Sequence, residues 1–234
     1  MRTGKLGLST ISFSVILFLL VSIFANYNTV YAQDGNQSTT SSSSWSLGEP
    51  IHTPRSEIAG VAVNEKIYVI GGFDESGRST TTVEVYDPMT NKWTAAAPLP
   101  QPLDHTAAAS YDGKLYLVGG GYLNRDDLSN KLFIYDPTTN KWTEGTNLPD
   151  ARGALTANFI NGTLYAVGGV DVLGTSNTNL AYAPRTNTWT SAKPMPTARH
   201  GLAAVAFDDK VYVIGGGPDP GGSQTNLNEI FQSN

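Results

Sequence analysis

The chain contains no cysteine in its 234 residues. It therefore forms no disulfide, offers no thiolate ligand to a metal and has no cysteine that could carry a lipid. Its stability has to come from packing and ring closure. Histidine is also scarce, and the three histidines, His52, His105 and His200, lack the spacing of a metal site. We therefore expect neither a metal nor another cofactor.

Catalytic signatures are missing as well. The sequence has no G-x-S-x-G elbow, no glycine loop for phosphate and no H-E-x-x-H motif. Basic residues are few, since 15 Lys and Arg stand against 20 Asp and Glu, for a net charge of −5. Without residues 1–32, which hold two of the basic residues, the net charge is −7. This acidic balance argues against nucleic acid, whose binding depends on clustered Lys and Arg.

The N-terminal segment is typical of a secretion signal. Arg2 and Lys5 precede an uncharged apolar run from about residue 11 to residue 25, and Ala32 supplies the small residue of a cleavage site. The alternative is an uncleaved membrane anchor, because the run approaches the length that spans a bilayer. In that case residues 1–32 alone contact the membrane. We expect a secreted or cell-envelope protein with a disordered, Ser- and Thr-rich leader over residues 33–44.

Two glycosylation sequons occur, at Asn36 and Asn161. The motif has a high false-positive rate. At Asn161 a second interpretation is favoured, because Asn161-Gly162 is also a preferred two-residue hairpin turn.

A repeated phrase dominates the rest of the chain. An apolar run ends in Gly-Gly four times, with steps of 48, 49 and 47 residues, at positions 71–72, 119–120, 168–169 and 215–216. A tyrosine stands three positions before each doublet, and Trp93, Trp142 and Trp189 follow the first three. A period near fifty that contains several strands and no helix is typical of a radial β array with one blade per repeat.

The glycine doublet, the Tyr-Asp-Pro turn and the following tryptophan together resemble the kelch repeat. Residues 66–100 carry all of these elements, and residues 114–149 repeat them closely. The third copy departs from the pattern, since Ala183 follows Tyr182, and the fourth stops after Phe231, where a tyrosine is expected. The resemblance covers residues 45–234 and implies an all-β, kelch-type β-propeller.

Each repeat predicts four antiparallel strands, in the first copy at residues 58–63, 66–70, 83–86 and 92–95. The small residues at one position of each first strand, Gly60, Ala108, Ala157 and Ala204, predict that this strand is innermost. Trp45 has the spacing of an orphan fourth strand, and the last copy lacks one. We therefore expect four four-stranded blades closed by pairing the Trp45 strand with the last blade, which makes a monomer. The alternative is an open or truncated part of a six- or seven-bladed propeller.

The side chains that break the repeat symmetry are the candidates for function, because loops on a rigid scaffold carry recognition. In kelch proteins that bind peptides, the loops at the channel mouth provide many contacts. Arginines there suit carboxylate or phosphate groups, although they equally serve to bond loop carbonyls. The predicted ligand-binding residues at this mouth are Arg55, Glu57, Asp104, His105, Tyr122, Arg125, Arg152, Arg199 and His200.

Three functions stay open on the sequence alone. The first is a non-catalytic module that binds protein or glycan. The second is a carbohydrate-active enzyme similar to the propeller sialic-acid epimerases, with an acid/base set drawn from Glu57, His105, Arg152, Arg199 and His200. The third is a propeller fragment completed by oligomerisation. Copper-radical oxidase chemistry is excluded, because its crosslinked tyrosine needs a cysteine. A buried carboxylate beside a histidine favours the enzyme, and a shallow polar mouth favours binding.

Overall fold

The computed structural model describes residues 44–121 and 127–233, and the chain divides into two compact units, residues 1–46 and 47–234. Of the first unit only residues 44–46 are described, as exposed chain outside any strand. The predicted signal segment, most of the predicted leader, Tyr122 and Arg125 lie outside the described residues. In the described part, no helix is long and apolar enough to cross a membrane.

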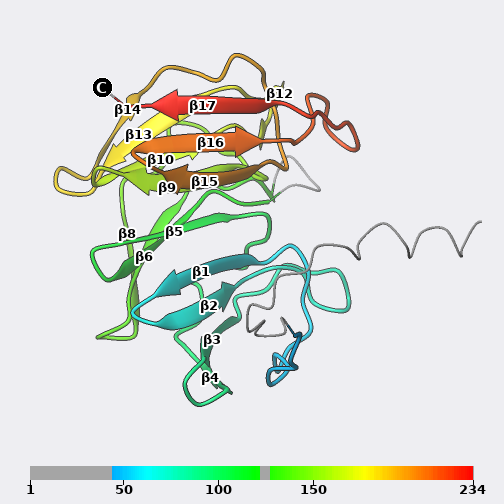
Figure 1. Ribbon diagram of the computed structural model, residues 1–234, viewed down its shortest axis with the longest axis vertical. Helices are drawn as coiled ribbons and strands as arrows, with labels where there is room; N and C mark the ends of the chain where they lie inside the picture. Colours follow the sequence, from blue (N-terminus) through cyan, green and yellow to red (C-terminus); the bar gives the residue numbers. More distant parts are fainter. Residues whose placement is uncertain (1–43, 122–126, 234) are drawn as a thin grey trace, which may run out of the picture. The chain divides into compact units, whose positions relative to one another are not determined.

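The second unit is all-β, with four antiparallel sheets that follow one another along the chain (Figure 1). The first blade consists of β1 (Ala59–Val63), β2 (Lys66–Ile70), β3 (Val83–Asp87) and β4 (Lys92–Ala95), in that order across the sheet. The sequence placed all four strands within one residue. The predicted all-β fold with four blades is therefore confirmed.

The second and third blades repeat this order, and the last blade repeats its first three strands. Their strands are β5 (Ala107–Tyr111), β6 (Lys114–Val118), β7 (Leu132–Asp136) and β8 (Lys141–Glu144); β9 (Thr156–Ile160), β10 (Thr163–Val167), β13 (Asn179–Ala183) and β14 (Thr188–Ser191); and β15 (Ala203–Phe207), β16 (Lys210–Ile214) and β17 (Asn228–Gln232). A short hairpin, β11 (Val170–Asp171) with β12 (Gly174–Thr175), rises from the third blade.

The hairpin turns follow from residues that tolerate a left-handed backbone. Asn64 and Glu65, between β1 and β2, have φ of 49° and 62°, as a two-residue turn with positive φ at both positions requires. Asn161 has φ of 50° and precedes Gly162, so the hairpin interpretation of this sequon is confirmed. At the outer turns the Asp87 carboxylate accepts a hydrogen bond from the Met89 N–H at 2.9 Å. That bond fixes the turn between β3 and β4.

Apolar side chains fill the space between consecutive blades. The face of a blade that packs on the following blade is called its trailing face, and the opposite face its leading face. At the first junction, trailing-face residues such as Val63, Ile70 and Val85 pack with leading-face residues Leu115 and Phe133. The second and third junctions repeat this contact. The strands β1, β5, β9 and β15 are neighbours in turn, which confirms that the first strand of each repeat is innermost.

A tyrosine, an asparagine and a tryptophan anchor each of the first three blades to the connector before it. In the second blade, Tyr135 donates a hydrogen bond to the side-chain oxygen of Asn140 at 2.8 Å, and the same oxygen accepts the Ala97 N–H at 2.7 Å. The indole of Trp142 donates to the Ala97 carbonyl at 2.9 Å. Equivalent bonds link Tyr86, Asn91 and Trp93 to Glu49, and Tyr182, Asn187 and Trp189 to Thr146.

The predicted closing strand is not formed in the structure, which corrects that expectation. Trp45 belongs to no strand and its side chain is fully exposed, while the last sheet contains three strands, β15, β16 and β17. The last blade lacks the anchor of the others, because Phe231 stands where they have a tyrosine and carries no hydroxyl group. The predicted four-stranded closing blade is therefore not seen among the described residues.

Candidate functional site

Four equivalent residues, one before each first strand, build a backbone ladder across the blades. They have left-handed φ values, 51° at Glu57, 49° at His105, 51° at Ala154 and 58° at Gly201. The N–H of His105 donates to the Glu57 carbonyl at 3.2 Å, that of Ala154 to His105 at 2.9 Å, and that of Gly201 to Ala154 at 2.9 Å. Three of these residues are not glycine, so the loops hold them in a conformation that L side chains rarely adopt.

The ladder residues line a central depression of about 150 Å³. Each blade contributes a ladder residue and its successor, the first pair being Glu57 and Ile58. A neighbouring depression of about 320 Å³ is lined by Ser79, Pro102, Leu103, Asp104, Gly121 and Asp127. Because Asp104 and His105 are adjacent in the chain, the two hollows lie on either side of one dipeptide. Together they are called the mouth.

The polar centre of the mouth is His105. Its Nδ1 lies 2.6 Å from a carboxylate oxygen of Asp104, and its Nε2 lies 3.2 Å from a carboxylate oxygen of Glu57. The other oxygen of Asp104 accepts a hydrogen bond from the Ser79 hydroxyl at 2.5 Å. Asp104 is buried, whereas about half of the Glu57 side chain is exposed. Loops from the first two blades thus hold an imidazole between two carboxylates.

The pKa of Asp104 reflects a competition. Burial acts to raise it, but the hydrogen bonds from His105 and Ser79, with the charge of His105, lower the pKa below the usual value of an aspartate. The carboxylate is therefore ionised in the folded protein at neutral pH. An ionised Asp104 fixes the imidazole ring so that Nε2 faces Glu57 and the surface.

Three of the four predicted arginines, Arg55, Arg152 and Arg199, lie beneath the loops, with side chains that are fully buried. Each donates to the carbonyl of the first glycine of its doublet: Arg55 to Gly71 at 2.5 Å, Arg152 to Gly168 at 3.2 Å and Arg199 to Gly215 at 2.5 Å. The structure thus shows the bonds to loop carbonyls that the sequence offered as one interpretation. These guanidinium groups hydrogen-bond to the loops from beneath. Their positive charges are therefore buried and do not line the mouth.

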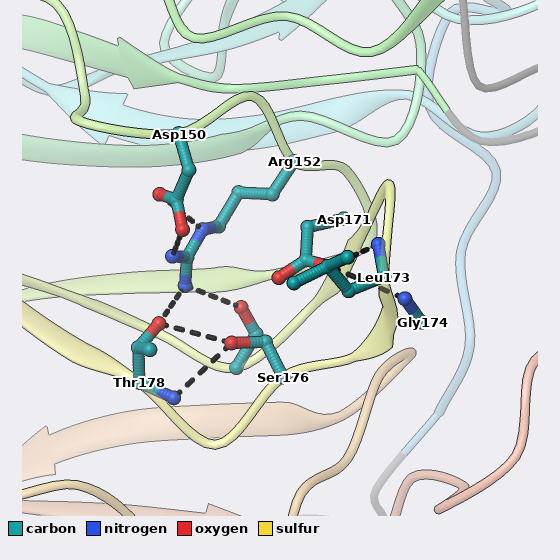
Figure 2. A network of polar contacts seen from close by, with 8 residues as sticks. Asp150, Arg152, Asp171, Leu173, Gly174, Ser176 and Thr178 are labelled. Atoms are coloured by element: carbon teal, nitrogen blue, oxygen red, sulfur yellow. Dashed lines mark hydrogen bonds and ion pairs between the residues drawn. The ribbon is translucent and has the colours of Figure 1, made fainter.

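Carboxylates neutralise the buried arginines. Arg55 pairs with Glu84 at 2.7 Å and Arg199 with Glu229 at 2.8 Å. In the third blade, Figure 2 shows Arg152 between Asp150 and the Thr178 hydroxyl, with Ser176 3.1 Å from Thr178. In the same view, Asp171 accepts the N–H groups of Leu173 and Gly174 at the tip of the β11–β12 hairpin.

The remaining predicted residues are dispersed. The Nε2 of His200 lies 3.0 Å from the Asp219 carbonyl, so its ring faces the loop after β16. Neither depression is lined by His200. Of the nine predicted residues, the structure brings three together at the mouth: Glu57, Asp104 and His105. No group of three or more His, Asp or Glu with the geometry of a metal site occurs among residues 44–121 and 127–233.

A family model described as the KLHDC2/KLHL20/DRC7 Kelch-repeats domain matches residues 23–216, which is most of the chain. The chain belongs to the kelch-repeat family. The resemblance inferred from the glycine doublets and Tyr-Asp-Pro turns is therefore confirmed.

Individual kelch relatives match over shorter stretches. Alpha-scruin of Limulus polyphemus is 28% identical over 126 residues, 48% of this chain and 14% of its own length. Beta-scruin of the same organism is 40% identical over 73 residues, 31% of this chain and 8% of its own length. Among solved structures, YjhT superposes with a TM-score of 0.62 at 25% identity, over 74% of this chain and 61% of the YjhT chain. The chain therefore spans only part of each of these proteins.

Some features of the kelch mouth were missed from the sequence. Ser79 lies in a loop of variable sequence, and nothing in its context points to Asp104. The partners of the arginines left a signal, because Glu84 and Glu229 occupy one position of the repeat in the two blades concerned. A glutamate inside an otherwise apolar strand indicates a buried cationic partner.

Proposed function

We propose that this kelch-repeat chain is a non-catalytic protein-binding module whose mouth receives a basic segment of a partner protein. One observation carries the proposal. The described residues lining the two depressions include three acidic residues, Glu57, Asp104 and Asp127, and no lysine or arginine. Opposite charge across an interface steers association and selects the partner. The general role of kelch propellers, which is to bind proteins, supports the same conclusion.

The small volume of the central depression favours a protein side chain over a small molecule there. The central depression, at about 150 Å³, is smaller than the roughly 300–1,000 Å³ of pockets that enclose small ligands. It matches one side chain. A lysine or arginine that enters there meets Glu57, whose carboxylate is half exposed and 3.2 Å from His105.

Selection from a random peptide library on the full chain tests this proposal. We expect enrichment of lysine and arginine within short extended sequences, and weaker retention of the selected peptides as salt rises. Enrichment of acidic or purely apolar peptides contradicts the proposal. Binding of glycans in a parallel glycan array, with no peptide enriched, contradicts it as well.

A second candidate function is favoured by one observation. The buried carboxylate of Asp104 beside His105 is the feature that acid/base catalysis requires, since a carboxylate fixes the ring and its tautomer. Glu57 at 3.2 Å supplies a second acid/base group. A carbohydrate-active enzyme is therefore the alternative. Proton exchange at sugar carbons, followed by NMR in D₂O with a panel of monosaccharides, supports it if exchange is seen with the wild type and lost in His105→Gln.

We also propose that the protein acts outside the cytoplasm, as a secreted or cell-surface module. The support is the order of charged, apolar and small residues from Arg2 to Ala32. Mass spectrometry of exported material is expected to find a terminus at Gln33. A membrane-bound chain that retains residues 1–32 supports the anchor instead.

A further inference from the structure

The trailing face of the last blade is apolar and exposed. Val205, Phe207, Ile214 and Ile230 alternate along β15, β16 and β17, and their side chains are 52%, 69%, 45% and 55% exposed. Large exposed apolar patches of this kind mark interaction sites. The first blade buries three of the equivalent residues: Val63 and Val85 are each 7% exposed, and Ile70 is fully buried.

The structure itself shows what covers such a face. At all three junctions the cover is the leading face of the next blade, where Leu115, Leu164 and Val211 occupy one equivalent position and are fully buried. The first blade presents the same kind of face, and there the equivalent Ile67 is 40% exposed. One chain therefore carries both halves of a junction that it forms three times internally.

The last blade also has no fourth strand beside β17 among the described residues. Beside β17 lies a groove of about 300 Å³ lined in part by Lys193, Pro194, Met195 and Phe231. In the other blades the fourth strand occupies this position, with Trp in the second place of Lys92–Ala95, Lys141–Glu144 and Thr188–Ser191. The sequence Ser-Trp-Ser-Leu at residues 44–47 has the same pattern, and Trp45 is fully exposed.

One arrangement satisfies both features. We propose that a second copy of this chain packs head to tail on the first, with its first blade on the trailing face of the last blade. In the first three repeats the fourth strand directly precedes the connector to the next blade. A second copy docked in this way therefore brings its own residues 44–47 to the open edge of β17. The backbone ladder, which ends at Gly201, continues into Glu57 of that copy. This inference does not depend on the ligand proposed for the mouth.

The contact is heterologous, because two different surfaces meet. Such contacts close into rings or extend into filaments, according to the rotation between copies. Two copies that engage each other reciprocally cover both trailing faces and both leading faces. The arrangement also removes the exposed edge strand, which otherwise promotes uncontrolled pairing.

Sedimentation velocity on the full chain over a concentration series tests the proposal. We expect the wild type to sediment as a dimer or larger assembly and Phe207→Lys to sediment as a monomer. Leu173→Lys is the matched control, since Leu173 is 93% exposed at the tip of the β11–β12 hairpin, away from the proposed contact. Trp45→Ala is expected to raise the dissociation constant at least tenfold. A wild type that is monomeric throughout, or a Phe207→Lys that assembles normally, overturns the proposal.

A mixing experiment tests the direction of the contact. Phe207→Lys blocks the trailing face and Ile67→Lys blocks the leading face, so each variant alone is expected to be monomeric. Their mixture still offers one intact face of each kind and is expected to form a one-to-one dimer. An Ile67→Lys variant that keeps its fold, checked by its melting temperature, and still dimerises alone shows a symmetric contact and overturns the head-to-tail arrangement.

Discussion

The guanidinium of Arg55 lies 2.7 Å from the carboxylate of Glu84, and both groups are buried beneath the loop that ends in Glu57. Arg199 and Glu229 repeat this pair in the last blade. At the same repeat positions in the second blade stand Leu103 and Phe133, which belong to the apolar cluster of the first junction. The same pair of repeat positions therefore holds a buried ion pair in two blades and an apolar pair in another.

This relationship predicts strong coupling between Arg55 and Glu84. Arg55→Leu is expected to lower the free energy of unfolding by about 3–5 kcal/mol, because it removes the guanidinium partner of a buried carboxylate and leaves only the partly exposed His52 at 3.4 Å. Arg55→Leu with Glu84→Phe copies the pair of the second blade and is expected to recover most of that loss. Chemical denaturation measures both, with Arg185→Leu as an exposed control. Losses that simply add in the double variant contradict the coupling.

The anchor at the second blade predicts a graded series. Tyr135→Phe removes one hydrogen bond and is expected to cost about 0.5–1.5 kcal/mol. Asn140→Gly keeps the left-handed backbone but removes the acceptor shared by Tyr135 and Ala97, so we expect a larger loss. Asn64→Gly controls for the backbone, since Asn64 has φ of 49° and makes only a long bond of 3.4 Å to Gly113. Equal losses at Asn64 and Asn140 would show that the anchor contributes nothing.

The glycine doublets predict a clash that sequence alone does not quantify. A Cβ at Gly71 would lie 2.3 Å from the Leu103 carbonyl oxygen, whereas a Cβ at Gly77 meets open space. Both glycines have positive φ, 60° and 74°. Gly77→Ala is therefore expected to cost about 1–2 kcal/mol from the backbone alone, and Gly71→Ala clearly more. Thermal melts of the two variants measure the difference.

The lowered pKa of Asp104 predicts a pH dependence. A group whose pKa is lower in the folded than in the unfolded state stabilises the fold above its unfolded pKa, about 3.9 for aspartate. That stability is lost as the pH falls through the folded pKa. We expect the melting temperature of the wild type to fall below about pH 4, and more steeply than that of Asp104→Asn. Parallel curves for the two proteins would contradict the role given to the His105 and Ser79 contacts.

The architecture was predictable from the sequence because the same pattern of apolar, glycine and turn residues recurs along the chain. The glycine doublets, the tyrosines and the Asn-containing turns placed the strands of the first blade within one residue. Whether the segment at Trp45 forms a strand was not predictable in this way. Its spacing matches Trp93, but spacing along the chain does not determine which edge strand a segment pairs with.

The site was harder to predict than the fold. Sequence position grouped Arg152 with Glu57 and His105 at the mouth, but the direction of a side chain is not visible in spacing. The long arginine side chain reaches inward to the Gly168 carbonyl, which needs a donor there because the doublet leaves its strand. Glu57 has a shorter side chain and remains about half exposed on the loop that carries it.

The most direct test of the central claim, that the mouth binds a basic protein segment, is isothermal titration of a selected peptide into Glu57→Gln and Glu65→Gln. The two glutamates lie before and after β1, both have positive φ, and both are exposed. The account predicts that Glu57→Gln weakens binding about tenfold or more, while Glu65→Gln binds like the wild type and both variants melt like it. Equal affinities for the two variants, or binding that survives replacement of every Lys and Arg of the peptide by Gln, would contradict the account.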